Sequence, residues 1–444
     1  MKVFFDTLGC MKNFADSEAA AGMLEKAGHT IAEFPEDADV IVVNTCGFIE
    51  DAKRESISEI FEMARYRDEG KKLIVSGCMA QRYAGELFNE IPEADGFLGV
   101  NDYAKLPEMI DQLADPDGER IFLCHGAGAA SLEDDMAYRK IPEHPYSTFL
   151  RIAEGCDNYC TYCVIPEIRG PYRSRSMESI VGEAERLAAS GCRELVLIAQ
   201  DTSYYGMDRY GKLMLPELLR RLVKIDGIRW IRLMYCYQDR ITEELIETIA
   251  TEEKVCDYID IPIQHASDKV LREMNRRSTR QSLEETITAL RRRIPDIHIR
   301  TTLIVGFPGE TDEDFEELLD FVKKMRFERL GVFEYSQEEG TPAAARDDQI
   351  PKEIKEERLD RIMTEQMTIS REKNEELIGQ VLPVIVDELD DDGSCIGRTI
   401  YDAPEIDNSV IFIPVKAHEP GDITSVRILD AFDYDLEGRE VTES

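Results

Sequence analysis

Three cysteines in one short segment carry the strongest chemical signal in this sequence. Cys156, Cys160 and Cys163 stand in the run E-G-C-D-N-Y-C-T-Y-C, with the spacing C-x3-C-x2-C. Such thiolates can hold an iron–sulfur cluster, in which each iron normally takes one cysteine. Three ligands for four irons would leave one iron open to a substrate or cofactor, much as catalytic zinc sites keep an open position. A structural zinc site, or a redox pair of Cys160 and Cys163, is the alternative, but no fourth Cys or His follows nearby.

Three more cysteines, Cys10, Cys46 and Cys78, follow predicted strands in the first part of the chain. Each comes after a short apolar run and stands beside a glycine, and they are separated by 36 and 32 residues, about one βα unit each. Parallel strands end at one edge of a sheet, so the three thiols can meet there in a second metal site. The alternative is three small buried cysteines. The runs are Val3–Phe5, Val40–Val43 and Leu73–Val75.

The strands alternate with helical periodicity, which predicts α/β architecture in two successive parts. A parallel-sheet α/β domain is expected over residues 1–118, followed by a small, acidic linker at 125–135. A second set of about six βα units predicts a partial (β/α) barrel over 142–372, with Cys156–Cys163 just after its first strand. Its expected strands are Phe149–Ile152, Glu194–Ala199, Trp230–Met234, Tyr258–Ile261, His298–Val305 and Gly331–Tyr335.

The last part, residues 374–444, reads as a small antiparallel β-barrel of OB-like kind. From Arg371 to Ser444 there are 6 Lys and Arg against 19 Asp and Glu, whereas OB-like barrels that hold nucleic acid usually line a basic groove. Its expected strands are Val381–Val386, Cys395–Thr399, Ser409–Ile413 and Ile423–Leu429.

Composition narrows the class of protein. The formal net charge of -37 over 444 residues repels phosphates, which argues against nucleic-acid binding, and it favours basic partners. No apolar run reaches the length of a membrane span, and the amino terminus reads as a strand rather than a signal peptide. Eleven cysteines fit a reducing compartment. We therefore expect a soluble, cytoplasmic protein.

The order of these features resembles the methylthiotransferases, which are radical S-adenosylmethionine (SAM) enzymes. That family has an N-terminal cluster domain, a radical SAM barrel with a C-x3-C-x2-C motif, and a C-terminal TRAM domain. The resemblance covers essentially the whole chain. Of its two main branches, one modifies an adenosine in tRNA and the other an aspartate in the twelfth protein of the small ribosomal subunit.

Four stretches are similar to the ribosomal branch, and the acidic C-terminal part agrees with a basic protein substrate. Thr7 and Met11 depart from the commoner Ser and Pro of that branch, and Cys236 and Gln238 stand where Leu and Pro are frequent. The alternatives are the tRNA branch and, in another class, a noncatalytic iron–sulfur or zinc protein. The stretches are Thr7–Asn13, Ile165–Arg175, Pro262–Asp268 and Tyr401–Asp407.

The resemblance implies two [4Fe–4S] clusters, and SAM that binds at the open iron of the first. Reductive cleavage of SAM would give a 5′-deoxyadenosyl radical that removes hydrogen from the aspartate β-carbon, where a methylthio group is then attached. A reduced flavodoxin- or ferredoxin-type protein would supply electrons. The implied ligands of the first cluster are Cys156, Cys160 and Cys163, and those of the second are Cys10, Cys46 and Cys78.

The remaining candidates surround SAM or the substrate. We expect Tyr162, Gln200, Gly306 and Glu310 to bind SAM, although Tyr162 could equally pack in a core. His265 fits a hydrogen-bonded packing residue better than a substrate contact. Three arginines either clamp a carboxylate or pair internally: Arg169, Arg173 and Arg175. The other five cysteines are expected to be free thiols: Cys124, Cys192, Cys236, Cys256 and Cys395.

Overall fold

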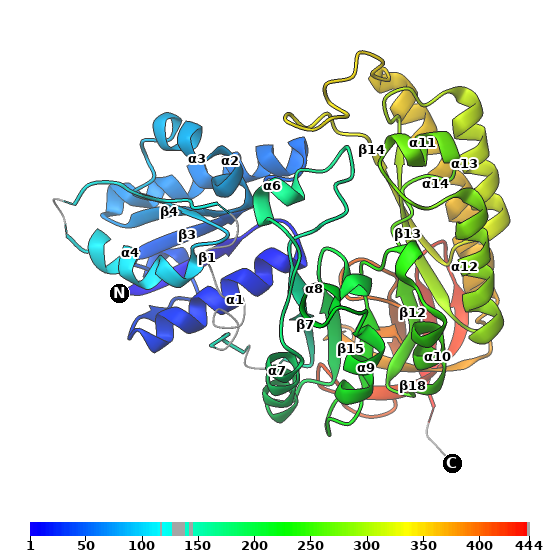
Figure 1. The fold of residues 1–444 in the computed structure, drawn as a ribbon. Coiled ribbons are helices and arrows are strands. Elements are labelled where there is room, and N and C mark those ends of the chain that lie inside the picture. The colour runs from blue at the N-terminus through cyan, green and yellow to red at the C-terminus, as the bar shows by residue number, and fades with distance from the viewer. Residues whose placement is uncertain (116–117, 127–137, 142–144, 442–444) are drawn as a thin grey trace. The chain divides into compact units, whose positions relative to one another are not determined.

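The structure is a computed structural model that describes residues 1–115, 118–126, 138–141 and 145–441. The chain divides into two compact units, whose segments can be followed by colour in Figure 1. The predicted linker at 125–135 lies largely outside the described residues. Unit 1 comprises Met1–Pro142, Arg151–Glu183 and Ser336–Ala344, and unit 2 comprises Glu143–Leu150, Ala184–Tyr335 and Ala345–Ser444.

A parallel sheet forms the centre of unit 1. Its strand order is β2-β1-β3-β4-β5-β6, and each neighbouring pair is parallel. Because β2 and β3 flank β1 on opposite sides, the winding reverses between β1 and β3, which is the topological switch point of a doubly wound sheet. The strands are β1 (Lys2–Thr7), β2 (Thr30–Ile31), β3 (Val40–Thr45), β4 (Lys72–Gly77), β5 (Gly96–Gly99) and β6 (Ile121–Leu123).

Both faces of this sheet are buried at its centre, which explains the continuous apolar run Val40–Val43 of β3. On β3, Ile41 and Val43 belong to one core cluster, which includes residues of α2 and α3. Val40 and Val42 belong to the opposite cluster, which includes residues of α1 and α4. The sheet therefore lies between two helical layers (Figure 1). The helices are α1 (Met11–Lys26), α2 (Glu50–Ala64), α3 (Cys78–Glu90) and α4 (Leu106–Leu113).

Unit 1 also contains the segment with the C-x3-C-x2-C motif. There β8 (Ala153–Glu154) pairs antiparallel with β9 (Arg173–Ser174), and the short helix α6 (Ile165–Arg169) lies between them in sequence. The third segment, Ser336–Ala344, contacts the motif directly, since the Ala343 amide donates to the Thr161 carbonyl at 3.0 Å. Both predicted cysteine triplets thus belong to one compact unit.

The central sheet has the order β14-β13-β12-β11-β10-β7, in which the strands follow one another as they do along the chain. The pairs from β10 to β14 are parallel, as expected for consecutive βα units of a partial barrel. The expected strands agree with the observed ones to within a few residues. These are β7 (Ser147–Arg151), β10 (Glu194–Ile198), β11 (Trp230–Leu233), β12 (Val255–Asp260), β13 (His298–Val305) and β14 (Arg329–Glu334).

Helices connect these strands. The last helix is long and leads to the C-terminal part of the chain. Val305, at the end of β13, and Phe315, on the helix that follows, are both buried. The helices are α7 (Met177–Ala189), α9 (Leu215–Leu222), α10 (Glu243–Thr251), α12 (Arg280–Arg293), α13 (Asp312–Met325) and α14 (Lys352–Glu375).

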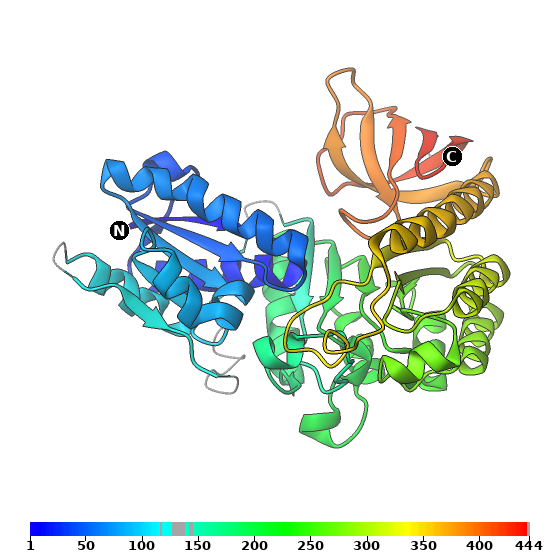
Figure 2. The same ribbon diagram turned by 90° about the horizontal axis from the view of Figure 1, so that it is seen from above.

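A closed barrel of order β15-β16-β17-β19-β18 follows α14 and is drawn orange to red in Figure 2. Its pairs are antiparallel except for β17 and β19, which run parallel. The predicted small barrel is confirmed, but its fifth strand, β19, was not predicted from the sequence. The strands are β15 (Val381–Leu389), β16 (Cys395–Thr399), β17 (Val410–Ile413), β18 (Ile423–Ala431) and β19 (Leu436–Glu440).

Buried ion pairs join this barrel to the central sheet within unit 2. Glu194 at the start of β10 contacts Arg398 of β16 at 2.8 Å and Arg232 of β11 at 2.9 Å. The ring of His298 stacks on Tyr401 with 4.0 Å between centroids. Glu194 and His298 are the first residues of their strands, so the contacts lie at the amino ends. The predicted motif Tyr401–Asp407 therefore helps to attach the barrel to the sheet.

Among the described helices, none combines the length and the apolar composition needed to cross a membrane.

Candidate functional site

The three dispersed cysteines meet at the carboxyl edge of the N-terminal sheet. Cys10 follows β1 and caps the start of α1, Cys46 follows β3, and Cys78 is the first residue of α3 after β4. These strands are neighbours in the order β1-β3-β4, so their ends are adjacent. Cys46 and Cys78 are buried and Cys10 is exposed. The site lies at the switch point between β1 and β3, where open α/β sheets bind their ligands.

Two glycines allow the strand ends to approach this closely. Gly9 has φ +86°, and a Cβ on it would stand 2.7 Å from Cys46 Cβ and 3.1 Å from Cys46 Sγ. Gly77 has φ +95°, and a Cβ there would stand 2.4 Å from Asn44 Oδ1. Any other residue would meet both backbone strain and overlap at these positions.

Asn13, in the first turn of α1, connects the three strand ends. Its Nδ2 donates to the carbonyl oxygens of Leu8 at 2.8 Å and Thr45 at 3.2 Å, which lie two residues before Cys10 and one residue before Cys46. Its Oδ1 lies 3.7 Å from Cys78 Sγ. The side chain is fully buried, so these bonds fix the loops that carry the cysteines. From the sequence, Asn13 could be recognised only as part of the motif Thr7–Asn13.

Further hydrogen bonds hold the backbone of the buried cysteine after β3. The amide of Cys46 donates to Ser56 Oγ at 3.0 Å, and that hydroxyl donates back to the Cys46 carbonyl at 3.1 Å. Asn44 Nδ2 donates to the Asn13 carbonyl and to Ser17 Oγ, both at 2.9 Å. The loop after β3 is thus bonded to both α1 and α2.

The thiols of this triplet interact with one another electrostatically. Burial raises the pKa of Cys78 to about 12, Arg169 opposes that rise, and Cys10 and Cys46 add to it. Burial also raises the pKa of Cys46, and the charge of Cys10 adds to this rise. Metal ligation requires thiolates, so binding of metal here releases protons. Three mutually close thiols beside a cation suit an anionic iron–sulfur cluster.

The second triplet lies in the loop between β8 and α6. Cys156 and Cys160 are buried and Cys163 is half-buried. The Cys156 amide donates to the Gly170 carbonyl at 3.1 Å, which closes the loop at its base, and Asn158 Nδ2 donates to Cys156 Sγ at 3.4 Å. Burial raises the pKa of Cys163, and Cys160 and Cys156 add to the rise. The predicted triplet is thus one compact group, and Tyr162 within it is half-buried.

Within the part of the chain that the structure describes, no three His, Cys, Asp or Glu side chains converge as they would around a single metal ion. A zinc ion needs four ligands at about 2.0–2.3 Å from one point. In a four-iron cluster each thiolate binds a different iron, so its ligands are spaced more widely. None of the eleven cysteines forms a disulfide.

Two of the three predicted arginines pair internally. Arg169 contacts Glu154 Oε1 and Asp16 Oδ2, each at 3.0 Å. Arg175 contacts Glu183 Oε2 at 2.6 Å and donates to the Arg151 carbonyl at 2.7 Å. For Arg169 and Arg175 the geometry therefore favours internal pairing over a carboxylate clamp.

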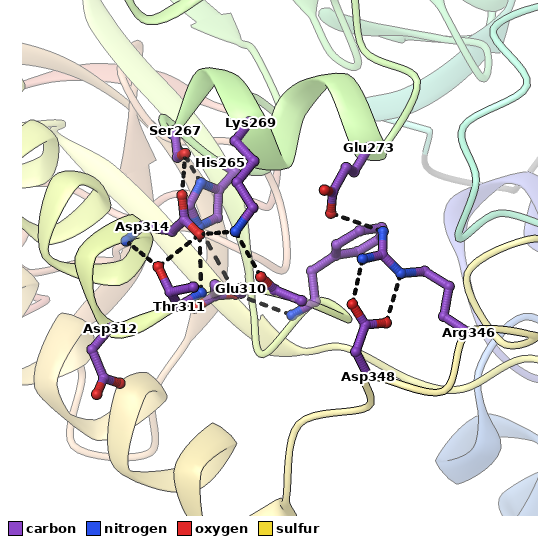
Figure 3. A network of polar contacts seen from close by, with 12 residues as sticks. His265, Ser267, Lys269, Glu273, Glu310, Thr311, Asp312, Asp314, Arg346 and Asp348 are labelled. Atoms are coloured by element: carbon purple, nitrogen blue, oxygen red, sulfur yellow. Dashed lines mark hydrogen bonds and ion pairs between the residues drawn. The ribbon is translucent and has the colours of Figure 1, made fainter.

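In unit 2, the predicted Gly306–Glu310 motif forms the turn between β13 and α13 (Figure 3). Glu310 is buried: its Oε1 accepts from Arg358 Nη1 at 3.0 Å, and its Oε2 accepts from the Phe307 amide at 3.0 Å. Burial raises the pKa of Glu310 to about 7. Lys269 Nζ donates to the Gly309 carbonyl at 2.9 Å and to Asp314 Oδ2 at 2.7 Å, which fixes the turn.

His265 packs beside this turn. Its Nδ1 accepts from the Ser267 amide at 2.9 Å, and its Nε2 lies 3.9 Å from Glu310 Oε2 (Figure 3). Burial lowers the pKa of His265 to about 3, so the ring is neutral near pH 7. This geometry agrees with the hydrogen-bonded packing role expected from the sequence.

Gln200 follows β10 and is half-buried. The next residue, Asp201, accepts from the Ser203 hydroxyl at 2.6 Å and from the Tyr204 amide at 3.1 Å. Asp201 also pairs with Arg240. The loop at the carboxyl end of β10 is thus held by Asp201, which bonds within the loop and pairs with Arg240.

Comparison with known proteins decides the family. Three family models match the chain: the Radical SAM superfamily at residues 150–322, uncharacterized protein family UPF0004 at 2–99, and the TRAM domain at 378–441. The ribosomal protein uS12 methylthiotransferase RimO of Lachnoclostridium phytofermentans is 50% identical over 442 residues, which are 99% of each chain. The chain belongs to the RimO family.

Two other relatives lead to the same family. RimO of Desulfitobacterium hafniense is 48% identical over 99% of this chain and 98% of its own length. RimO of Acetivibrio thermocellus is 47% identical over 100% of this chain and 99% of its own. The predicted methylthiotransferase family, with its radical SAM and TRAM domains, is therefore confirmed, as is the assignment to the transferases. The predicted alternatives are not favoured.

Solved structures support the fold alone, because their sequence identity is low. The radical SAM methyltransferase TsrM from Kitasatospora setae, described with cobalamin and a [4Fe–4S] cluster bound, has a TM-score of 0.54 at 16% identity. That likeness covers 77% of this chain and 76% of TsrM. The cobalamin-dependent radical enzyme OxsB has a TM-score of 0.52 at 14% identity, over 83% of this chain and 56% of OxsB.

Proposed function

We propose that this protein is a radical SAM methylthiotransferase that adds a methylthio group to the β-carbon of an aspartate in ribosomal protein uS12. The observation that carries the proposal is the identity of 50% with a RimO protein over 99% of both chains. The position of both cysteine triplets in one compact unit supports it, because methylthio transfer requires two sites that act on one substrate.

The two triplets would each hold a [4Fe–4S] cluster through three thiolates. Cys156, Cys160 and Cys163 would hold the cluster that binds SAM, and Cys10, Cys46 and Cys78 the second, sulfur-donating cluster. When bound, these clusters and SAM supply the one-electron and sulfur-transfer chemistry. The chain itself positions the thiolates: Asn13 and Ser56 fix two of the strand-end loops, and the Gly170 carbonyl closes the loop of the other triplet.

For SAM we retain Tyr162, Gln200, Gly306 and Glu310 as proposed contacts. Tyr162 and Gln200 are half-buried, so a ligand can reach their side chains. Glu310 is buried and already bonded to Arg358 and to the Phe307 amide. It would therefore act by holding the Gly306–Gly309 backbone in the shape that SAM contacts.

The proposed substrate and partners follow from charge. A protein with a formal net charge of -37 attracts a basic ribosomal protein and repels tRNA. The acidic C-terminal barrel would take part in this recognition. A reduced flavodoxin- or ferredoxin-type protein would donate electrons, and a ribosomal substrate places the reaction in the cytoplasm. We retain three domains, at 1–118, 142–372 and 374–444, as the proposed organisation.

The test incubates the anaerobically reconstituted, reduced protein and SAM with uS12 or with tRNA. A mass gain of one methylthio group on the uS12 aspartate supports the proposal. A gain on tRNA alone would reassign the chain to the tRNA branch. Failure to cleave SAM under strong reductant would favour a noncatalytic iron–sulfur protein.

A further inference from the structure

We propose that Arg169 is a positioning residue for the N-terminal cluster, whose reduction potential it raises through a charge-assisted hydrogen bond to the sulfur of Cys78. The inference rests on the proposed second cluster. Arg169 itself belongs to the segment of the other triplet, because it ends the helix α6, which begins two residues after Cys163.

The guanidinium of Arg169 is buried among three hydrogen-bond acceptors and one further carboxylate of unit 1, that of Asp16. Its Nη2 lies 3.3 Å from Cys78 Sγ and 2.9 Å from Asn13 Oδ1. The same nitrogen lies 3.0 Å from Asp16 Oδ2, and Nη1 donates to Glu154 Oε1 at 3.0 Å. Only 2% of the residue is exposed. A planar fork with several fixed donors suits such a set of acceptors, and a lysine ammonium does not reproduce it.

The charged side chains around Arg169 balance one another when Cys78 is a neutral thiol. Arg151 pairs with Asp16 and lies 2.9 Å from Glu154 Oε2, so two arginines face two carboxylates. All four residues are buried. A thiolate at Cys78 therefore adds a negative charge to a neutral group, at the side where Arg169 presents its N–H. The arginine has a partner with or without metal, which keeps it in place.

Packing fixes the distance between this donor and the sulfur. Cys78 forms a small apolar cluster with Val164 and Ile168, which precede Arg169 on the same short segment. The backbone of α6 is therefore held against the first residue of α3. The donor is held by apolar contacts, by hydrogen bonds to Asn13 and Glu154 and by the ion pair with Asp16. The bond to sulfur therefore does not depend on the metal for its geometry.

A hydrogen bond and a positive charge at a ligating sulfur stabilise the more negative, reduced state of an iron–sulfur cluster. Removing Arg169 should therefore make the N-terminal cluster harder to reduce. Lysine keeps the charge but loses the planar fork that bonds to several acceptors, so Arg169→Lys should have a smaller effect than Arg169→Met. The change in the reduction potential of each variant can be measured without enzymatic turnover.

The experiment uses the full chain with Cys156, Cys160 and Cys163 all changed to Ala, so that iron can bind only at the N-terminal site. Arg169→Met and Arg169→Lys are made in this background, with Arg120→Met as the control. Arg120 is an arginine of the same unit that bonds to the carbonyls of Phe88, Ile91 and Ala94. Each protein is reconstituted, its iron is counted, and its midpoint potential is measured by dithionite titration with electron paramagnetic resonance.

We expect the parent to bind iron and Arg169→Met to lower the equilibrium constant for one-electron reduction at least tenfold, about 59 mV. Arg120→Met should leave the potential unchanged. Iron bound at an unchanged potential in Arg169→Met overturns this inference alone, whereas a parent without iron overturns the two-cluster proposal as well. If Arg169→Met does not fold, Arg169→Met with Glu154→Gln, which restores charge balance, must show a lower potential than Glu154→Gln alone.

Discussion

Arg329 and Asp402 form a buried ion pair between the first residue of β14 and the turn after β16. Arg329 Nε and Nη2 both donate to Asp402 Oδ1, at 2.9 and 2.6 Å. Asp402 Oδ2 accepts from the Thr399 hydroxyl at 2.6 Å. Together with the pairs of Glu194, this contact fixes the C-terminal barrel to the amino ends of the central strands.

The first prediction concerns this attachment. Asp402→Ala leaves the Arg329 guanidinium buried without its carboxylate, and we expect it to lower the free energy of unfolding by about 3–5 kcal/mol. Asp391→Ala, in an exposed turn of the same barrel, should change it by less than about 0.5 kcal/mol. Urea unfolding of the three proteins measures both values. Equal stability of the two variants would contradict a structural role for the pair.

The second prediction concerns Asn13. Asn13→Ala removes the donor to the Leu8 and Thr45 carbonyls, and a buried unsatisfied group costs about 1–3 kcal/mol. We expect the variant to lose the iron of the N-terminal site and keep that of the other. Asn89→Ala, whose exposed side chain bonds within its own helix to the Gly85 carbonyl, is the control and should keep all iron. Full iron content in Asn13→Ala would refute the role given to this residue.

The third prediction separates backbone strain from contact at Gly9. Gly9 and Gly28 both have positive φ, +86° and +92°, but a Cβ on Gly28 meets nothing within 4 Å. Gly28→Ala should therefore cost only the left-handed backbone, about 1–2 kcal/mol. Gly9→Ala adds the overlap with Cys46, so it should cost more and also reduce iron binding. Thermal unfolding and iron analysis check both, and a Gly9→Ala protein that matches Gly28→Ala would disprove the proposed overlap.

The fourth prediction is a dependence of stability on pH. Burial would raise the pKa of Glu194, but Arg398 and Arg232 outweigh it and lower the pKa from 4.5 to about 2. As the pH falls, Glu194 therefore binds a proton at a higher pH in the unfolded state than in the folded state. The stabilisation is complete above pH 4.5 and is lost as the pH falls toward 2.

The test of this pH dependence uses Glu194→Gln. The variant should be less stable at neutral pH, because it leaves two buried arginines with one carboxylate fewer. Between pH 4.5 and 2 the parent should lose up to about 1.4 kcal/mol per pH unit more than the variant. Urea unfolding across that range measures the difference, and parallel curves would exclude Glu194 as the source.

The strands that carry the cysteines could be predicted because their signal is local. Val40–Val43 is a β-branched run with a Cys and a Gly after it. By contrast, β5 has glycine at both ends, and β19 alternates buried and exposed positions among charged residues, so neither has a strong apolar pattern. Short, polar strands become strands only through their neighbours in the sheet.

The two cysteine triplets could also be proposed as ligands from their spacing. The side chains that hold these cysteines in place could not be predicted from the sequence. Asn13 and Arg169 are 156 residues apart in the chain, and their contact arises only when α6 packs against α3. The sequence left Arg169 between a substrate clamp and an internal pair, and burial decides for the pair. Side chains that act through tertiary contacts carry no periodicity that a sequence pattern can detect.

We propose that the chain holds two clusters, one at each cysteine triplet. Iron and sulfide analysis of the reconstituted protein beside Cys10→Ala and Cys156→Ala tests it most directly. We expect about eight irons in the parent and about half in each variant, since each change removes a ligand of one four-iron cluster. A Cys10→Ala protein that keeps the iron content of the parent would contradict it.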